Sequence, residues 1–151
     1  MKGEVDDVLV VDDYGHHPTE LSVTLRALRS NFPDRRLVVL FQPHRYTRTR
    51  DHHAEFADVL AQADVVGLLP IYPASETPIV GVDSDLLTSR LRDDHGVRTR
   101  SLVSIDDACD WAADEARDGD LWLTQGAGDI ARLADPLLQR LRRDRAEGGD
   151  A

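Results

Sequence analysis

Histidine and arginine side chains are concentrated in one part of this sequence. Five of the six histidines lie between residues 16 and 53, and residues 42–53 carry three arginines against a single acidic residue, Asp51. Guanidinium groups offer forked N–H donors that match a carboxylate or a phosphate. The segment therefore predicts a site for an anionic ligand, although arginines at this spacing fit a solvated surface about as well.

A second polar cluster follows the apolar run at residues 8–11. Asp12 and Asp13 come first, and Tyr14, His16 and His17 follow them. An isolated Asp-Asp pair is more often a turn or a helix entry than a binding site, but its place directly after a strand favours binding. Adjacent histidines on regular structure point in different directions, so no metal ion is predicted between them.

Two further loops place polar groups at the ends of predicted strands. Residues 72–76, which begin with Tyr72, follow the third strand, and residues 126–129, which end with Asp129, follow the last one. Because the carboxyl ends of parallel strands meet at one edge of an open sheet, we expect all four loops to line one cleft. The sequence Gly-Ala-Gly at 126–128 is too short for a dinucleotide fingerprint and by itself indicates a tight strand-to-helix turn.

The elements that position these loops follow from the apolar pattern. Buried strands are predicted at residues 8–11, 37–41, 65–69 and 121–124, with a weaker alternating strand at 97–103 and a short antiparallel edge at 2–5. Helices are predicted behind Pro18, after the Arg/His-rich loop, behind a cap at Asp83 or Ser84, and behind Ser104, with a tail broken near Pro136. This alternation predicts a Rossmann-like α/β fold, in which helices cover both faces of an open, mostly parallel sheet of about six strands.

Composition excludes several classes of protein. The 151 residues suit one domain, and 28 acidic side chains against 18 lysines and arginines give a net charge of −10, which argues against a nucleic-acid partner. No apolar stretch is long enough to span a bilayer and none forms a signal core, so we expect a cytoplasmic protein without a membrane partner. Cys109 is the only cysteine, and we expect it to pack in the core with Trp111.

Two activities of open α/β domains lack their required residues here. A phosphoacceptor receiver domain needs an aspartate after its third strand and a lysine after its fifth, whereas the third strand here runs into Pro70 and Lys2 is the only lysine. A nucleotide hydrolase needs a GxxxxGK[ST] loop, which the sequence does not contain. The chain therefore cannot hold a triphosphate unaided.

Five segments taken together closely resemble the C-terminal domain of the Mur ligase family, and in particular its alanine-adding members. The segments are residues 12–20, 41–49, 71–79, 81–84 and 126–130. The resemblance covers essentially the whole chain, so residues 1–151 are expected to be one such domain. Since family members have three domains, the resemblance implies that the UDP-substrate domain and the central ATPase domain are absent and that this chain is an excised fragment.

The resemblance also implies a reaction. Such a ligase uses ATP and Mg²⁺ to phosphorylate the carboxylate of UDP-N-acetylmuramate, and the amine of L-alanine then attacks the acyl phosphate to form an amide of the peptidoglycan precursor. This domain is expected to bind the amino acid and to contact the central domain. Alone, it is expected to be inactive and to bind no cofactor.

Site residues carry over from the family motifs position by position. The resemblance implies that His44, Arg45 and Arg48 act at the reacting acyl phosphate, and that these three, with Tyr14, Tyr72 and Asp129, bind substrate. It assigns Asp13, His16 and His17 to the nucleotide and leaves open which histidine makes the contact. Diaminopimelate-adding members carry an arginine where Ala74 stands, so a small, uncharged substrate side chain is expected. No metal ligand is expected in this chain.

Two alternatives remain open from the sequence. One is a free-standing, non-catalytic Mur-like module that binds a partner protein or a small anion. The other is the corresponding domain of the related ligase that attaches muramoyl tripeptide during wall recycling, because that enzyme shares these motifs.

Overall fold

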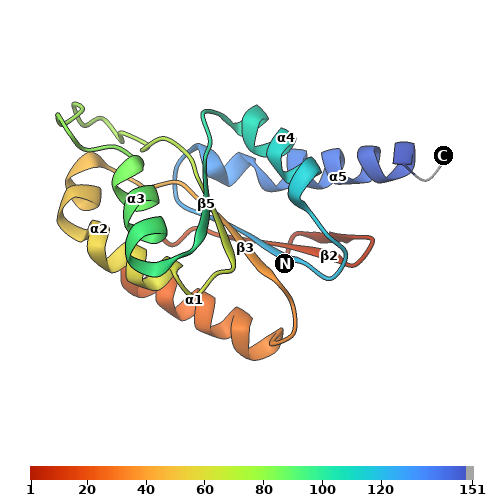
Figure 1. The fold of residues 1–151 in the computed structure, drawn as a ribbon. Coiled ribbons are helices and arrows are strands. Elements are labelled where there is room, and N and C mark those ends of the chain that lie inside the picture. Colours follow the sequence, from red (N-terminus) through yellow and green to blue (C-terminus); the bar gives the residue numbers. More distant parts are fainter. Residues whose placement is uncertain (149–151) are drawn as a thin grey trace.

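A six-stranded sheet forms the centre of the protein in a computed structural model, which describes residues 1–148. The strand order is β1-β2-β6-β3-β4-β5, and every neighbouring pair is parallel except β1 and β2. The strands are β1 (Gly3–Val5), β2 (Val8–Asp13), β3 (Leu37–Phe41), β4 (Val65–Leu68), β5 (Arg98–Ser101) and β6 (Leu121–Gln125). The predicted mostly parallel sheet with an antiparallel N-terminal edge is confirmed (Figure 1).

Five α-helices cover the sheet. They are α1 (Pro18–Asn31), α2 (Tyr46–Leu60), α3 (Asp85–His95), α4 (Ile105–Glu115) and α5 (Ala134–Gly148), and a 3-10 turn, η1 (Asp129–Arg132), precedes α5. Helices α1, α2 and α3 lie together on one side of the sheet, and α4 and α5 lie on the other (Figure 1). None of these helices combines the length and the apolar character needed to cross a bilayer.

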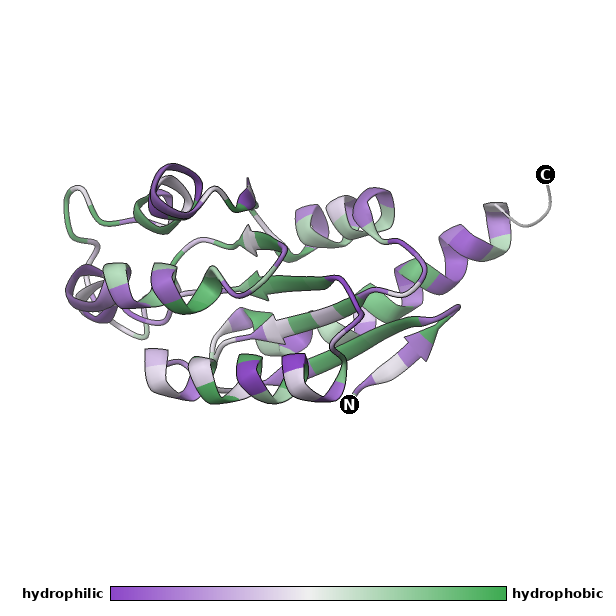
Figure 2. Ribbon diagram, turned by 60° about the horizontal axis from the view of Figure 1, so that its bottom comes forward, coloured by the Kyte–Doolittle hydropathy of each residue, from purple (hydrophilic) through white to green (hydrophobic). Residues whose placement is uncertain are grey.

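The two faces of the sheet bury separate apolar clusters. On β3, Val38 and Leu40 pack with α4 and α5, whereas Val39 and Phe41 pack with α1, α2 and α3. Successive side chains of a strand point to opposite faces, so a continuous apolar run is what a sheet covered on both sides requires. Figure 2 shows this as apolar strands in the middle and polar stretches on the helices.

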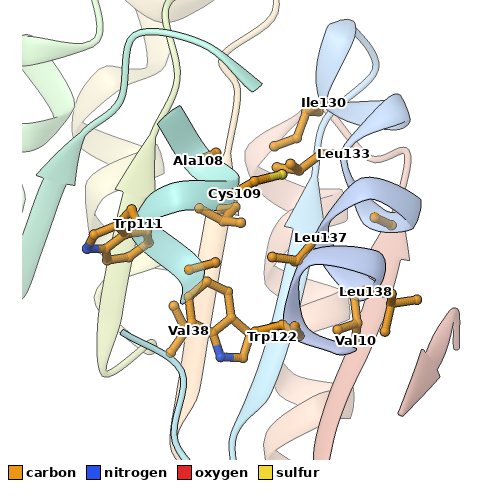
Figure 3. Close-up of a cluster of buried hydrophobic side chains, with 14 of the residues drawn as sticks. Val10, Val38, Ala108, Cys109, Trp111, Trp122, Ile130, Leu133, Leu137 and Leu138 are labelled. Atoms are coloured by element: carbon orange, nitrogen blue, oxygen red, sulfur yellow. The ribbon is translucent and has the colours of Figure 1, made fainter. Parts of the chain in front are cut away.

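Trp122 belongs to the apolar cluster between the sheet and helices α4 and α5 (Figure 3). Its ring is fully buried and lies 5.5 Å from that of Trp111, and Cys109 belongs to the same cluster. The prediction that Cys109 and Trp111 are packing residues is confirmed.

The order of the strands differs from their order along the chain. The chain passes from β2 through α1 to β3, then to β4 and β5, and returns over the opposite face through α4 to place β6 between β2 and β3. Crossovers of one hand require helices on opposite faces when the direction of winding reverses. The carboxyl ends of β2, β6, β3 and β4 therefore lie side by side.

Three local expectations are corrected or refined by the structure. The Arg/His-rich stretch is mostly helix rather than loop, because α2 already begins at Tyr46. Pro136 does not break the C-terminal helix but lies in the first turn of α5, where its missing N–H has no helical acceptor. At α3 the N-cap position is Ser84, but the capping hydrogen bond is accepted by Asp83, whose Oδ1 lies 2.9 Å from the amide nitrogen of Asp85.

Candidate ligand site at the carboxyl ends of the strands

Gln125 holds the loop that follows β2. The side chain, fully buried at the end of β6, donates from Nε2 to Asp13 Oδ2 (2.8 Å) and to the carbonyl oxygen of Gly15 (2.7 Å). The hydroxyl of Thr24 on α1 donates to the same oxygen of Asp13 at 2.9 Å. A Cβ at position 15 would lie 2.7 Å from Gln125 Nε2, so a larger residue there would displace the Gln125 amide. Asp13 thus orients the loop that follows β2.

His16 and His17 point to different surroundings. His17 is the N-cap of α1, where its Nδ1 accepts from the amide of Thr19 at 3.3 Å and its own amide donates to Glu20 Oε1 at 3.2 Å. The His17 ring also contacts that of His52 on α2, with centroids 5.2 Å apart. His16 instead has its ring centroid 5.4 Å from that of His44. Of the two, His16 faces the other candidate residues.

The loops after β3 and β4 are joined by backbone hydrogen bonds. The amide of Tyr72 donates to the carbonyl oxygen of Pro43, and the amide of Arg45 donates to the carbonyl oxygen of Tyr72, both at 2.8 Å. The rings of His44 and Tyr72 stack with centroids 5.4 Å apart and planes 23° from parallel. The ring of His44 therefore lies next to the rings of both Tyr72 and His16.

Arg48 completes this group from the first turn of α2. Its Nη1 lies 3.1 Å from His44 Nδ1 and 3.0 Å from the His44 carbonyl oxygen. Burial and the nearby charges of Arg48, His16 and Arg45 lower the pKa of His44 below its ordinary value of 6.5. A neutral imidazole beside two guanidinium groups results.

The start of α2 shows a residue that sequence analysis missed. Arg45 is the N-cap, but its side chain accepts no capping hydrogen bond, and its φ of 74° lies in the left-handed region. Glu76 from the β4–α3 loop serves instead: its Oε1 accepts from the amide of Thr47 (3.1 Å) and its Oε2 from the Thr47 hydroxyl (2.6 Å). These bonds hold the pKa of Glu76 below its ordinary value, chiefly through the hydroxyl. In the sequence, the only indication of this role was an acidic residue that follows the turn at residues 73–75.

The Gly-Ala-Gly turn brings the last loop against Tyr72. A Cβ at Gly128 would lie 2.5 Å from Tyr72 Cγ and 2.7 Å from Gln42 Oε1. Buried Gln42 accepts from the amide of Ile130 at 3.0 Å and donates to the carbonyl oxygen of Pro70 at 3.2 Å, so it links this turn to the β4 loop. Asp129, next to Gly128, is exposed at the edge of the group.

The structure brings four of the nine predicted site residues into direct contact with one another. His16, His44, Arg48 and Tyr72 form one contiguous group, which we call the histidine–arginine cluster. Tyr14 joins it only at the edge: its side chain is 64% exposed, and its carbonyl oxygen lies 3.4 Å from His16 Nδ1. Beside the cluster lies a cavity of about 320 Å³ between α2, α3 and the β5–α4 loop; its lining includes Tyr46, Ile71, Ser84 and Val103.

The chemistry open to this cluster is anion binding. Arg48 offers guanidinium donors, and exposed Arg45 adds a second positive charge beside it. Because a guanidinium group can only donate, His44 Nδ1 accepts from Arg48, and the proton of the neutral ring lies on Nε2 as a further donor. Within residues 1–148, no set of three or more His, Cys, Asp or Glu side chains is arranged to hold a metal ion.

Comparison with known proteins points to one family. The family model described as "Mur ligase, glutamate ligase domain" matches residues 1–128. The UDP-N-acetylmuramate–L-alanine ligase of Geotalea daltonii is 46% identical over 143 residues, which cover 94% of this chain and 31% of that protein. The chain therefore spans about a third of the length of this curated relative.

Solved structures share the fold. The UDP-N-acetylmuramate–alanine ligase MurC of Thermotoga maritima matches with a TM-score of 0.74 and 23% identity, over 91% of this chain and 27% of that one. The murein peptide ligase of Psychrobacter arcticus matches with a TM-score of 0.75 and 23% identity, over 93% and 28%. The family match over residues 1–128 and the shared fold lead to one conclusion: this chain belongs to the Mur ligase family.

Proposed function

We propose that this chain is the C-terminal domain of a cytoplasmic, ATP-dependent ligase that joins L-alanine to UDP-N-acetylmuramate through an acyl phosphate. The observation that carries this proposal is the convergence of His16, His44 and Tyr72, from three separate loops, with Arg48 from the first turn of α2 into one cationic cluster. The 46% identity to an alanine-adding ligase supports the choice of amino acid. The remaining domains of such an enzyme would lie outside this chain.

The cluster suits the reacting end of the substrates. Arg45 and Arg48 would neutralise the carboxylate of the amino acid or the charge on the acyl phosphate, and His44 Nε2–H would add one more donor. Tyr72 holds His44 by stacking, and exposed Tyr14 and Asp129 lie at the edge, where they would meet substrate. Holding the amine close to the carbonyl and keeping water away are what this domain would contribute to the step.

The loop after β2 suits the nucleotide. Because His17 caps α1, we assign the contact with ATP to His16. We assign the second carboxylate oxygen of Asp13, Oδ1, to a hydroxyl of the ribose. Asp13 Oδ2 already accepts from Gln125 and Thr24. ATP would supply the phosphoryl group that activates the carboxylate, and we propose that Mg²⁺ is held by residues outside this chain.

The β4–α3 loop suits a small amino acid. Ala74 lies in the turn between Tyr72 and Glu76 and carries no charged or polar side-chain atom. A substrate with a second carboxylate would find no partner there, and an unpaired buried charge is strongly disfavoured. L-Alanine meets this restriction. The likeness to the murein peptide ligase, at 23% identity, extends to the fold alone and does not favour the recycling reaction.

A chimeric enzyme tests the proposal directly. We would replace the matching third of the Geotalea daltonii ligase with this chain and measure phosphate release in the presence of ATP and UDP-N-acetylmuramate. The expected result is release that depends on L-alanine and is not supported by meso-diaminopimelate or by tripeptide. A folded chimera that releases no phosphate with L-alanine would contradict the proposal.

Binding by the chain alone gives a second measurement. Because the other domains would complete both sites, calorimetry with ATP and with L-alanine should show no binding in the submillimolar range. Submillimolar binding of both ligands by this chain would mean that its sites are complete without further domains, which would contradict the proposal.

A further inference from the structure

The sequence at the start of helix α2 is electrostatically unfavourable for a helix N-terminus. Arg45, Arg48 and Arg50 lie at its N-terminus, where the helix dipole carries partial positive charge and repels cations. Its first turn contains no acidic residue, and the N-cap side chain accepts no hydrogen bond. An arginine-rich start of this kind needs an acceptor from another part of the chain.

Glu76 is that acceptor, 29 residues further along the chain. Both of its carboxylate oxygens are engaged by Thr47, one by the amide and one by the hydroxyl, at 3.1 and 2.6 Å. Ala74 and Ser75, immediately before it, have φ values of 51° and 71°, and the amide of Glu76 donates to the carbonyl oxygen of Pro73 at 3.0 Å. Two successive non-glycine residues in the left-handed region are unusual and indicate a turn held by its surroundings.

The position of the cluster depends on this turn of helix. Arg45 has a φ of 74° and a ψ of 141°, outside the regions that side-chain-bearing residues favour, and its amide is bound to Tyr72. Arg48 reaches back from the same turn to His44. If the first turn of α2 unwound, Arg45 could relax, and Arg48 would leave His44.

We propose that Glu76 is a positioning residue: by capping α2 from the β4–α3 loop, it holds Arg45 and Arg48 beside His44 in the geometry that the ligand requires. This inference rests on the proposed function of the cluster. Glu76 acts through Thr47 and is not placed in contact with the reacting atoms. The alternative is a cap that contributes to stability alone.

Asp107 offers a matched control for that alternative. It lies in the first turn of α4, where its Oδ2 accepts from the amide of Val103 at 2.9 Å and its amide donates to Ser104 Oγ at 3.1 Å. Like Glu76, it is a carboxylate that stabilises a helix start, but α4 covers the opposite face of the sheet. Asp107→Ala should therefore lower stability without displacing the cluster.

The first experiment uses this chain alone and does not depend on ligase activity. Glu76→Ala and Glu76→Gln remove the same charge, but only glutamine keeps a side-chain oxygen that can accept from Thr47. The pKa of His44, followed by NMR titration, should be higher in Glu76→Ala than in Glu76→Gln, because the alanine variant no longer holds Arg48 and Arg45 beside the ring. Comparing two variants of equal charge removes the direct effect of Glu76 on His44; the remaining neighbours, His16 and Tyr72, are unchanged.

The second experiment measures kcat and KM in the chimeric ligase. Glu76→Ala should lower kcat/KM about ten- to a hundredfold, as small misplacements of binding groups do, and Glu76→Gln should recover most of that loss. Asp107→Ala should keep kcat/KM within about twofold of the unchanged chimera, even if its unfolding midpoint falls as far as that of Glu76→Ala, because its hydrogen bonds go to Val103 and Ser104 and not to the cluster. A Glu76→Ala chimera that is folded and as active as the Asp107→Ala chimera would overturn the proposal.

Two further arms keep the result decisive. If Glu76→Ala does not fold, Thr47→Val removes only the hydroxyl donor and should shift the pKa of His44 in the same direction by a smaller amount. If the chimera is inactive even without substitution, the proposed function fails and the NMR comparison decides the positioning role by itself. Equal pKa values of His44 in Glu76→Ala and Glu76→Gln would overturn that role.

Discussion

One nitrogen of Arg48 contacts both the ring and the backbone of His44, the residue one helical turn before it, at 3.1 Å from Nδ1 and 3.0 Å from the carbonyl oxygen. The contact requires the imidazole to accept, so it exists only with neutral His44. Burial lowers the pKa of His44 most, and the Arg48 charge acts in the same direction.

Removing that charge should therefore raise the pKa of His44. We expect Arg48→Ala to move the pKa of His44 toward its ordinary value, as followed by NMR titration of the ring protons. Arg26→Ala, which removes an arginine from α1, is the control and should leave the pKa of His44 unchanged. A pKa of His44 that stays equally low in Arg48→Ala would show that Arg48 does not face the ring in solution.

Arg48 should also matter for turnover in the chimeric ligase. Loss of a charged donor at developing negative charge costs about 2–4 kcal/mol of transition-state stabilisation, so Arg48→Ala should lower kcat/KM correspondingly. The same Arg26→Ala substitution serves as the kinetic control. Steady-state phosphate release gives both parameters, and unchanged kinetics in Arg48→Ala would remove this arginine from the site.

Gly128 tests the packing beneath Tyr72. A methyl group at this position would meet Tyr72 Cγ at 2.5 Å and Gln42 Oε1 at 2.7 Å, so both side chains or the Gly128 backbone must move. We expect Gly128→Ala to lower the free energy of unfolding by about 1–3 kcal/mol, measured by urea denaturation. Gly148→Ala is the control, because nothing lies within 4 Å of the added methyl. Equal stabilities of the two variants would contradict the close contact.

Asp120 should set part of the acid stability. The side chain is 2% exposed, and it accepts from Arg36 Nη2 at 2.7 Å, from the amide of Arg117 at 2.9 Å and from Trp122 Nε1 at 3.0 Å. Burial alone would raise the pKa of Asp120, but these hydrogen bonds outweigh it and lower the pKa below 3.8. Asp120→Asn removes the charge but leaves Arg36 paired with Glu115, so we expect the free energy of unfolding to fall by about 1–3 kcal/mol at neutral pH.

The sign of the pH effect follows from the direction of the shift. Below pH 3.8 the unfolded chain binds a proton at this position before the folded one does, so the contribution of Asp120 is present above that value and is lost as the pH falls through the folded pKa. Urea unfolding between pH 5 and 3 should therefore be less pH-dependent in Asp120→Asn than in the unchanged chain. Asp118→Asn, at a side chain that is 77% exposed, should behave like the unchanged chain.

The fold could be predicted because its signals are local. Each parallel strand is covered on both faces, so the apolar runs are continuous, and Val38 to Phe41 alternate between two cores without any polar residue. The meeting of His16 with His44 was predictable for a similar reason, since the carboxyl ends of parallel strands converge. Neither inference needed contacts between distant side chains.

The remaining features depend on contacts that span the sequence. The Arg45 side chain cannot accept a capping hydrogen bond, and the residue that does, Glu76, lies 29 residues after Thr47, so the start of α2 could not be predicted from its local sequence. Sequence analysis could not separate the roles of His16 and His17, because the difference depends on which imidazole caps α1 and which one lies beside His44. Gln125 lies 110 residues from Gly15, so its hydrogen bond to that residue could not be predicted from the sequence, where it is simply the polar end of a strand.

The insertion of β6 between β2 and β3 has a consequence for synthesis of the chain. Until residues 121–125 leave the ribosome, β2 and β3 each expose a row of unpaired amides and carbonyls at what will become the middle of the sheet. A growing chain can therefore collapse around α1, α2 and α3, but it cannot close its sheet. Truncation before Leu121 would leave two unpaired strand edges that favour aggregation, and it would not produce a smaller folded domain.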